Sequence, residues 1–264
     1  MKTLQSVSDI IEHYDVYFVD IWGVLYNEGE GVIATACSGL QALQDTRKTV
    51  VLVSNSPRLG EAVITFLEGE GISRKLYQHI VTSGDCTRQY FESQGKPVLC
   101  YLVGRPHNQA MFKDLPITFV EAPEQAEVLV LCAPDRDSPT LDPFIPLLDR
   151  CLAAHVPMVC ANPDEYVLVK GEKIVRTGLL AQYYAEQGGQ VTLCGKPYAP
   201  IYERAKAFVS HVEKVRLLAI GDGLKTDILG AQNFGINSLW ICSGVSAGTH
   251  KRGITPTYTM QIFQ

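Results

Sequence analysis

The sequence predicts an α/β fold, in which a parallel sheet is flanked by helices and a second α/β unit is inserted. Short apolar runs without polar alternation recur along the chain, which is typical of parallel strands buried on both faces. Segments with helical spacing separate these runs, as crossovers between parallel strands require. A further series of such units over residues 98–161 starts after the first series has begun, which indicates an insertion. The chain of 264 residues, 46% hydrophobic and 19% charged, has the composition of a globular protein.

The first series of elements begins with a short amphipathic helix over residues 3–14, because Leu4, Val7 and Ile11 fall on one face. The strands expected to follow are 16–19, 50–53, 80–82, 191–194, 215–220 and 238–242. The helices expected between them are 35–47, 60–70, 85–94, 178–187, 199–209 and 227–233. Glycine commonly ends a helix, and Gly235 follows the last of these helices.

The inserted unit is expected to have a small sheet of its own. Its expected strands are 98–103, 128–132 and 157–161, with a helix over 142–155. The sequence therefore predicts a core of residues 1–84 and 176–264 and an inserted domain of residues 85–175. The tail from Ser246 onward gives only a weak signal.

Composition disfavours several classes of protein. The net charge of −5 comes without a basic cluster, which argues against nucleic-acid binding through phosphate contacts. Neither a signal peptide nor an apolar run of the roughly 18 residues that cross a bilayer is evident, so a cytoplasmic protein is expected. The eight cysteines form no CxxC pair, which disfavours a zinc site and favours reduced, buried thiols.

Polar side chains stand where four of the apolar runs end: Asp20, Ser54, Lys196 and Asp222. Each one alone has an ordinary explanation as a turn or helix-cap residue. Their recurrence at strand ends is more specific, because the carboxyl ends of neighbouring parallel strands meet at one edge of a sheet. If the four strands lie side by side in one sheet, these groups converge on a single site.

The four groups together suit phosphoryl transfer. Asp20 can attack phosphorus and carry a covalent aspartyl-phosphate. The carboxylates of Asp222 and of Asp227, five residues later, suit a hard cation such as Mg²⁺. Lys196 adds a positive charge, and Ser54 offers a hydroxyl donor to the same phosphate. The residues therefore predict catalysis by positioning and charge stabilisation.

The chain resembles the haloacid dehalogenase superfamily of phosphotransferases, subfamily IIA, the NagD-like or nitrophenylphosphatase-like group. The resemblance covers nearly the whole chain. Four motifs carry it: Asp20-Ile21-Trp22-Gly23-Val24-Leu25, Val53-Ser54-Asn55-Ser56, Gly195-Lys196-Pro197 and Gly221-Asp222-Gly223-Leu224-Lys225-Thr226-Asp227. Two further segments, Ser243-Gly244-Val245 and Ala161-Asn162-Pro163-Asp164, are also typical of relatives.

The resemblance implies a core similar to a Rossmann fold with an inserted cap, and it assigns roles to residues. Asp20 would be the nucleophile, with Ser54 and Lys196 holding the phosphate. Mg²⁺ would bind Asp20, Asp222 and the main-chain carbonyl of Trp22, with Asp227 as a direct or outer partner. Contacts to phosphate or substrate are further implied for Trp22, Gly23, Asn55, Ser56 and Asp164. The cap would select a small phosphomonoester, such as a sugar phosphate, nucleotide or aryl phosphate, and caps of this subfamily often form homodimer contacts.

One departure from the family pattern bears on activity. The pattern is Asp-x-Asp-Gly, and its second aspartate, the general acid in relatives, is Trp22 here. An indole N–H donates a hydrogen bond but cannot serve as an acid or a base. Three consequences stay open: a preference for good leaving groups, another acid such as His107 or Asp164, or binding of phosphorylated metabolites with little or no turnover. Trp22 itself is either a packing residue or a stacking surface for a sugar or base.

A dinucleotide-dependent oxidoreductase is the main alternative on the same type of sheet. That class requires a glycine-rich turn, G-x-G-x-x-G, after the first strand. Asp20-Ile21-Trp22-Gly23 lacks this turn, so the sequence favours the phosphatase.

Overall fold

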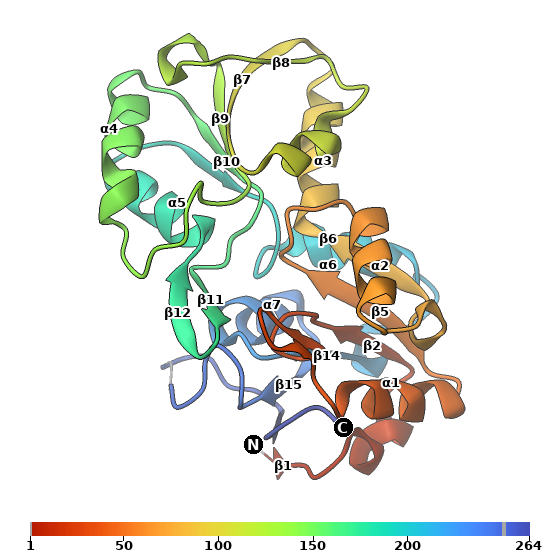
Figure 1. The fold of residues 1–264 in the computed structure, drawn as a ribbon. Helices are drawn as coiled ribbons and strands as arrows, with labels where there is room; N and C mark the ends of the chain where they lie inside the picture. The colour runs from red at the N-terminus through yellow and green to blue at the C-terminus, as the bar shows by residue number, and fades with distance from the viewer. Residues whose placement is uncertain (1, 250–251) are drawn as a thin grey trace.

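The computed structural model describes residues 2–249 and 252–264, and these form two α/β parts (Figure 1). In the first part the described strands build a seven-stranded parallel sheet. The order across the sheet is β1 (Lys2–Thr3), β16 (Tyr258–Met260), β15 (Asn237–Ile241), β14 (Leu217–Gly221), β2 (Val16–Val19), β5 (Thr49–Ser54) and β6 (His79–Thr82). The predicted α/β class with a parallel sheet is therefore confirmed.

Strand β2 lies inside this sheet, between β14 and β5, and is buried along its whole length. Its alternate side chains serve two separate cores, as the two-residue period of a strand requires. Tyr17 and Val19 pack in a core with α1 (Ala36–Asp45) and α2 (Gly60–Gly69), whereas Val16 and Phe18 face the opposite side. That opposite core includes residues of α3 (Ser83–Gln94), α6 (Ala199–Ala207) and α7 (Leu229–Phe234). Helices thus cover both faces of the sheet, which explains the uninterrupted apolar run.

The second part has a smaller parallel sheet, drawn at the upper left of Figure 1. Its order among the described strands is β13 (Val191–Leu193), β10 (Met158–Cys160), β9 (Val128–Leu131), β7 (Val98–Val103) and β8 (Ile117–Phe119). The helices α4 (Ile145–Ala153) and α5 (Thr177–Glu186) pack against it through Leu148, Leu180 and Tyr184.

One strand lies in a different sheet from the one expected. The prediction that the strand around residues 191–194 belongs to the first sheet is wrong, because β13 pairs with β10 at the edge of the second sheet. Helix α5 stays with the same sheet, where the Tyr184 hydroxyl donates to the carbonyl of Val156 at 2.5 Å. An apolar run predicts a strand, but its pairing partner depends on the connections that bring it there. The chain returns to the first part only at Gly195-Lys196.

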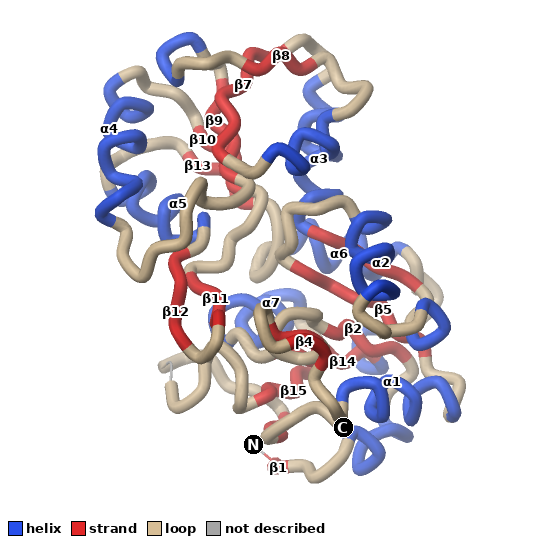
Figure 2. The backbone as a smooth tube through the Cα atoms, in the orientation of Figure 1, coloured by secondary structure: helices blue, strands red, loops and turns tan. Residues whose placement is uncertain are grey.

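Two short hairpins between the parts were not expected from the sequence (Figure 2). One joins β3 (Tyr26–Asn27) to β4 (Gly31–Val32), and the other joins β11 (Tyr166–Val169) to β12 (Glu172–Val175). A bridge between Glu28 and Val169 brings the two hairpins together. Among the described residues, no helix is long and apolar enough to cross a bilayer.

Candidate active site

The ammonium group of Lys196 occupies the centre of the site. Its Nζ donates to Asp20 Oδ1 at 2.6 Å, to Asp227 Oδ1 at 2.7 Å and to the carbonyl of Val53 at 2.9 Å. Only 2% of Lys196 is exposed. The strand that precedes Lys196, β13, belongs to the second sheet, yet Lys196 contacts Asp20 at the end of β2. The backbone N–H of Asp20 donates to the carbonyl oxygen of Ile220 at 2.9 Å.

The charges in this cluster depend on each other. Burial by itself lowers the pKa of Lys196, but the carboxylates of Asp20 and Asp227 outweigh it and raise that pKa above its ordinary value. Burial raises the pKa of Asp20 well above its ordinary value, Asp227 raises it further, and Lys196 opposes both. The lysine therefore stays charged and is the group that offsets repulsion among the acids.

Three buried carboxylates, those of Asp20, Asp222 and Asp227, form a cluster in which one oxygen of each lies within 4.8 Å of the others. Asp222 follows β14, and its Oδ2 accepts from the N–H of Val245 at 2.6 Å. The Oδ2 of Asp227 accepts from the N–H of Gly223 at 3.1 Å. Burial and then the charge of Asp227 raise the pKa of Asp222 to about 7.

Two glycines let the backbone approach Asp222 closely. A Cβ atom at Gly23 would lie 2.2 Å from Asp222 Oδ2, and one at Gly244 would lie 2.0 Å from the same oxygen. Gly23 also has a φ of +85°, a left-handed conformation that favours glycine. In the described part of the chain, no hydrogen bond ends on the carbonyl oxygen of Trp22, just before Gly23. The cradle around Asp222 therefore excludes any side chain at these two positions.

Asn55 forms hydrogen bonds both with the backbone of Lys196 and with Asp164 in the second part of the molecule. Its Oδ1 accepts from the N–H of Lys196 at 2.7 Å, and its Nδ2 donates to Asp164 Oδ1 at 2.8 Å and to the Lys196 carbonyl at 3.1 Å. The hydroxyl of Ser54 accepts from the N–H of Ser56 at 3.1 Å, which orders the loop after β5. Burial raises the pKa of Asp164 above its ordinary value.

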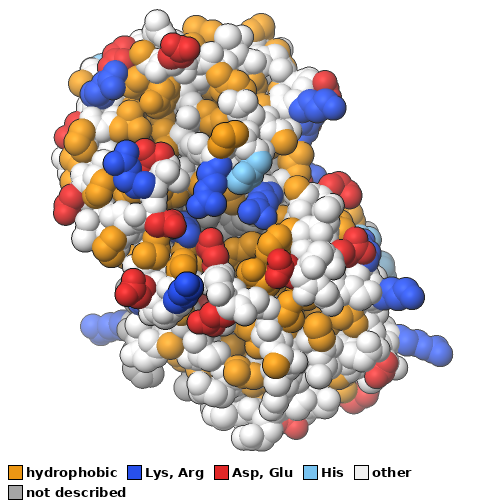
Figure 3. All heavy atoms as spheres, viewed as in Figure 1, with side chains coloured by type: hydrophobic (Ala, Val, Ile, Leu, Met, Phe, Trp, Pro, Cys, Tyr) orange, Lys and Arg blue, Asp and Glu red, His pale blue; other side chains and the backbone are white. Residues whose placement is uncertain are grey.

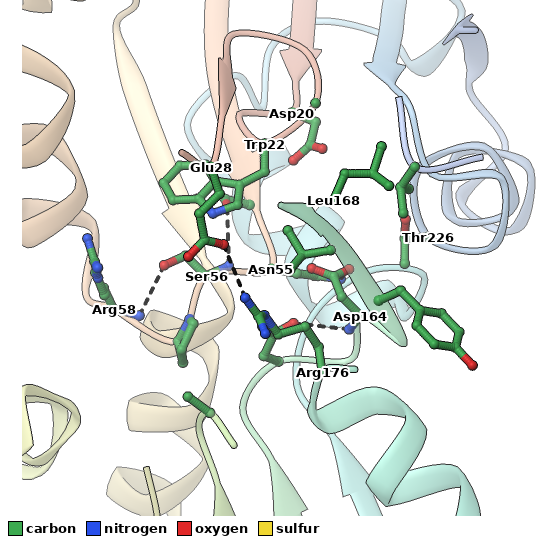
Figure 4. Close-up of a pocket in the computed structure, with 18 of the residues that line it drawn as sticks. Asp20, Trp22, Glu28, Asn55, Ser56, Arg58, Asp164, Leu168, Arg176 and Thr226 are labelled. Carbon is green, nitrogen blue, oxygen red and sulfur yellow. Dashed lines mark hydrogen bonds and ion pairs between the residues drawn. The ribbon is translucent and has the colours of Figure 1, made fainter. Parts of the chain in front are cut away.

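These groups open into one pocket of about 140 Å³ between the two parts (Figure 4). The first part contributes Asp20, Trp22 and Asn55, and the second contributes Asp164 and His107. In Figure 4 the carboxylate of Asp20 and the side chains of Asn55 and Asp164 lie around the same space. All of the residues assigned to the site from the sequence lie in this pocket or contact residues that line it.

Trp22 has two environments. Its ring lies 5.8 Å from that of Tyr26 and 5.7 Å from that of Phe66, measured between centroids. The indole is half-buried, and the residue also lines the pocket. Trp22 therefore both packs in an aromatic cluster and offers surface to a ligand, so the two interpretations made from the sequence are compatible.

Ion pairs between the two parts cannot be predicted from the sequence. Arg176 of the second part is 9% exposed. It contacts Glu28 of the first part and Asp137 of its own part, at 3.2 Å each. Lys225 pairs with Glu165 in the same region. Arg176 has no local motif around it, and its partners are distant in sequence, so only the tertiary structure identifies it. Arg58 could have been noticed, because it closely follows the Ser54 loop.

Comparison with known proteins agrees with this geometry. Residues 17–118 match a family model described as haloacid dehalogenase-like hydrolase, and residues 193–263 match a second, HAD-hydrolase-like model. A haloacid dehalogenase-like hydrolase from Brucella suis 1330 is 32% identical, with a TM-score of 0.90 over 99% of this chain and 100% of that one. The 5′-nucleotidase YutF of Bacillus subtilis is 27% identical over 90% of both chains. A glycerol phosphate phosphatase from Mycobacterium tuberculosis, solved in complex with magnesium, shares the fold at 21% identity, with a TM-score of 0.72 over 98% of this chain and 77% of that one.

The chain belongs to the haloacid dehalogenase-like hydrolases. Within them it is a member of subfamily IIA, the NagD-like or nitrophenylphosphatase-like group, since the similarity to that group spans both parts of the chain. The prediction that the chain is an enzyme of the phosphatase group in this superfamily is confirmed.

Proposed function

We propose that this protein is a Mg²⁺-dependent phosphatase that cleaves a small phosphomonoester through an aspartyl-phosphate at Asp20. The observation that carries the proposal is the buried contact between Lys196 and Asp20, 2.6 Å long, beside two further carboxylates at the end of a pocket. Burying an ammonium and a carboxylate next to further acids costs free energy of desolvation. Phosphate binding by Lys196 explains why the charged lysine is present there.

The chain's own residues divide the work as follows. An oxygen of Asp20 attacks phosphorus, the bond from phosphorus to the leaving oxygen breaks, and the leaving oxygen takes up a proton. Water then attacks the same phosphorus, and the Asp20–phosphorus bond breaks to give inorganic phosphate. Lys196 and the hydroxyl of Ser54 bind the phosphoryl oxygens, and Asn55 holds Lys196 in place.

The acidic cluster fits a hard divalent cation. Three buried carboxylates with one ammonium leave an excess of negative charge, which a Mg²⁺ ion bound by the carboxylate oxygens would balance. Asp20, Asp222 and the Trp22 carbonyl would hold Mg²⁺, with Asp227 beside them, and Gly23 would keep the approach open. The ion would neutralise charge on the phosphoryl group. The M. tuberculosis relative in complex with magnesium supports this assignment.

Chelation is expected to stop phosphate release from p-nitrophenyl phosphate, and Mg²⁺ added in excess is expected to restore it. Without the cation, the acids around Asp20 repel a phosphate dianion. The measurement is the initial rate of nitrophenol release before chelation, after it and after Mg²⁺ is returned. Full activity in the chelated protein would contradict the metal assignment.

Gly244→Ala is expected to weaken Mg²⁺ binding by about 10- to 100-fold, a range typical of changes around metal ligands. The new methyl group would displace the carboxylate of Asp222, which lies 2.0 Å from the added Cβ. Gly69→Ala is the matched control, because a Cβ there meets nothing within 4 Å. Titration calorimetry with Mg²⁺ measures both variants, and equal affinities would show that this close approach is not what places Asp222.

Substrates with good leaving groups are expected to react fastest. Trp22 cannot protonate the leaving oxygen, and an aryl or acyl oxygen departs without such help. Asp164 and His107 line the same pocket and are the candidates for a substitute acid. Sugar phosphates, nucleotides and glycerol phosphate are further candidates, in keeping with the relatives. A screen for phosphate release over a metabolite panel tests the function, and ligand binding without turnover would favour the alternative of a catalytically weak binding protein.

We also propose that the second part, with residues 85–175 at its centre, is the cap that selects the substrate. It forms one wall of the pocket and supplies Asp164. A cytoplasmic location and a homodimer formed through the cap remain proposals from the sequence. Light scattering after gel filtration tests the dimer.

A further inference from the structure

Two arginines that the chemistry at Asp20 does not use line the pocket, together with His107. Arg58 follows the Ser54 loop in the first part, whereas Arg105 and His107 belong to the second part. Figure 3 shows basic and histidine side chains gathered around the hollow between the two parts. The residues therefore reach one space from both sides of the pocket.

The two arginines differ in their pairing from a third arginine of the pocket. Among the described residues, neither Arg58 nor Arg105 has a carboxylate oxygen within 4.0 Å. Arg176, which lines the same pocket, is by contrast paired with both Glu28 and Asp137. The guanidinium of Arg58 lies 5.3 Å from the centre of the Phe66 ring, a contact that orients the group without neutralising it.

The pKa of His107 is affected by both arginines, which indicates that the two guanidinium groups lie near the same imidazole. Burial lowers the pKa of His107, and the charges of Arg58 and Arg105 lower it further. Each arginine comes from a different part of the molecule, yet both are close enough to disfavour a proton on one imidazole. A neutral His107 is then free to act as a hydrogen-bond donor or acceptor.

At the same wall, a buried amide N–H has no acceptor among the residues that the structure describes. Asn108 lines the pocket, is 2% exposed, and its Oδ1 accepts from the N–H of Arg105 at 2.8 Å. That contact fixes the orientation of the amide, so Nδ2 is the donor, and within the described chain Nδ2 has no hydrogen-bond partner. A buried donor without an acceptor is costly, which suggests that a ligand supplies the missing oxygen.

We propose that the substrate carries a second anionic group, a carboxylate or a second phosphate, and that Arg58, Arg105 and Asn108 bind it. The inference rests on the proposed function, because the first phosphate must sit at Asp20 for the second group to reach this wall. Guanidinium groups match the oxygens of a carboxylate or phosphate, and such charged contacts are the strong ones. Arg176 is already paired with Glu28 and Asp137, so it offers the anion no comparable site.

The alternative to a specific binding site is non-specific electrostatic attraction of phosphates by the charged pocket rim, and binding measurements distinguish the two. General steering raises the association rate of every anionic ligand and fades with added salt. A built site discriminates between ligands that share the phosphoryl group and differ only at the far end.

The test measures binding without turnover. Calorimetry with Mg²⁺ at physiological salt compares a series of ω-phosphonocarboxylates of increasing chain length with alkylphosphonates of the same lengths. Alkane-α,ω-bisphosphonates form the second arm, which separates a carboxylate site from a phosphate site. One chain length is expected to bind about tenfold or more tightly than its alkyl match, as a charge-assisted contact allows.

Variants then assign the preference to residues. Arg58→Gln, Arg105→Gln and Asn108→Asp are each expected to remove most of it while leaving the affinity for the alkylphosphonates nearly unchanged. Asn108→Asp keeps the oxygen that accepts from the N–H of Arg105 but replaces the Nδ2 donor by a second, negatively charged oxygen. Arg150→Gln is the control, because Arg150 pairs with Glu124 and does not line the pocket.

The outcomes separate the two proposals. Equal affinity of matched pairs at every chain length would overturn the second-anion site and leave the phosphate site standing. A preference that survives in all three variants would also overturn it. If the wild-type protein bound none of the phosphonates, the proposed function would fail, and this inference with it.

Discussion

Asp20→Asn is expected to reduce the turnover of p-nitrophenyl phosphate by about 10⁴-fold or more, the scale seen when a nucleophile is removed. The amide has nearly the same shape as the carboxylate but no charged oxygen to attack phosphorus. Lys196 keeps its contact with Asp227 at 2.7 Å, so the lysine remains paired. Initial rates in the presence of Mg²⁺ measure the effect.

The loss should not come from unfolding. The surroundings of Asp20 raise its pKa, which means that they disfavour the ionised carboxylate, so a neutral amide is expected to leave the melting temperature unchanged or higher. Asp45→Asn, at the exposed end of α1, is a matched control that should keep full activity. Persistent turnover by Asp20→Asn with Mg²⁺ present would rule out Asp20 as the nucleophile.

Trp22→Asp is expected to raise the rate on alkyl phosphates by about 10²- to 10⁴-fold, the usual contribution of a positioned acid. A carboxyl at this position can protonate the leaving oxygen, which indole cannot do. Aryl phosphates should gain much less, because their leaving oxygens need little protonation. The measurement is the ratio of kcat/KM for an alkyl phosphate to that for an aryl phosphate.

Trp22→Asn separates the acid from the change in packing. Both substitutions remove the indole from the cluster with Tyr26 and Phe66, so both should lower stability by similar amounts. Only the aspartate should recover alkyl phosphate turnover. Equal rates in the two variants would mean that another residue, such as Asp164 or His107, already protonates the leaving group.

Much of the fold could be predicted from local pattern. The run Val16–Val19 is apolar at every position because helices cover both faces of its sheet. The hairpins β3–β4 and β11–β12 escaped prediction, since they are too short for a clear two-residue alternation. The strand β16 in the tail was missed for the same reason.

The candidate site could be predicted in part. The pattern of strand ends predicts that Asp20, Asp222 and Asp227 lie together, because parallel strands end at the same edge, and their oxygens do meet. The same pattern predicts Lys196 beside Asp20, where it lies, but the reason is partly wrong because β13 belongs to the second sheet. Arg105 and Asn108 could not be identified, because nothing near them in the sequence marks which way they face.

The sequence by itself determined the α/β class and the acids at the strand ends, because both follow from local patterns of apolar and polar residues. Only the tertiary structure decided which sheet takes β13 and which charges at the pocket are paired. The physical reason is that pairing and neutralisation join residues far apart in the chain. Arg176 forms an ion pair with Glu28, which lies 148 positions away in the sequence, whereas Arg58 and Arg105 line the pocket.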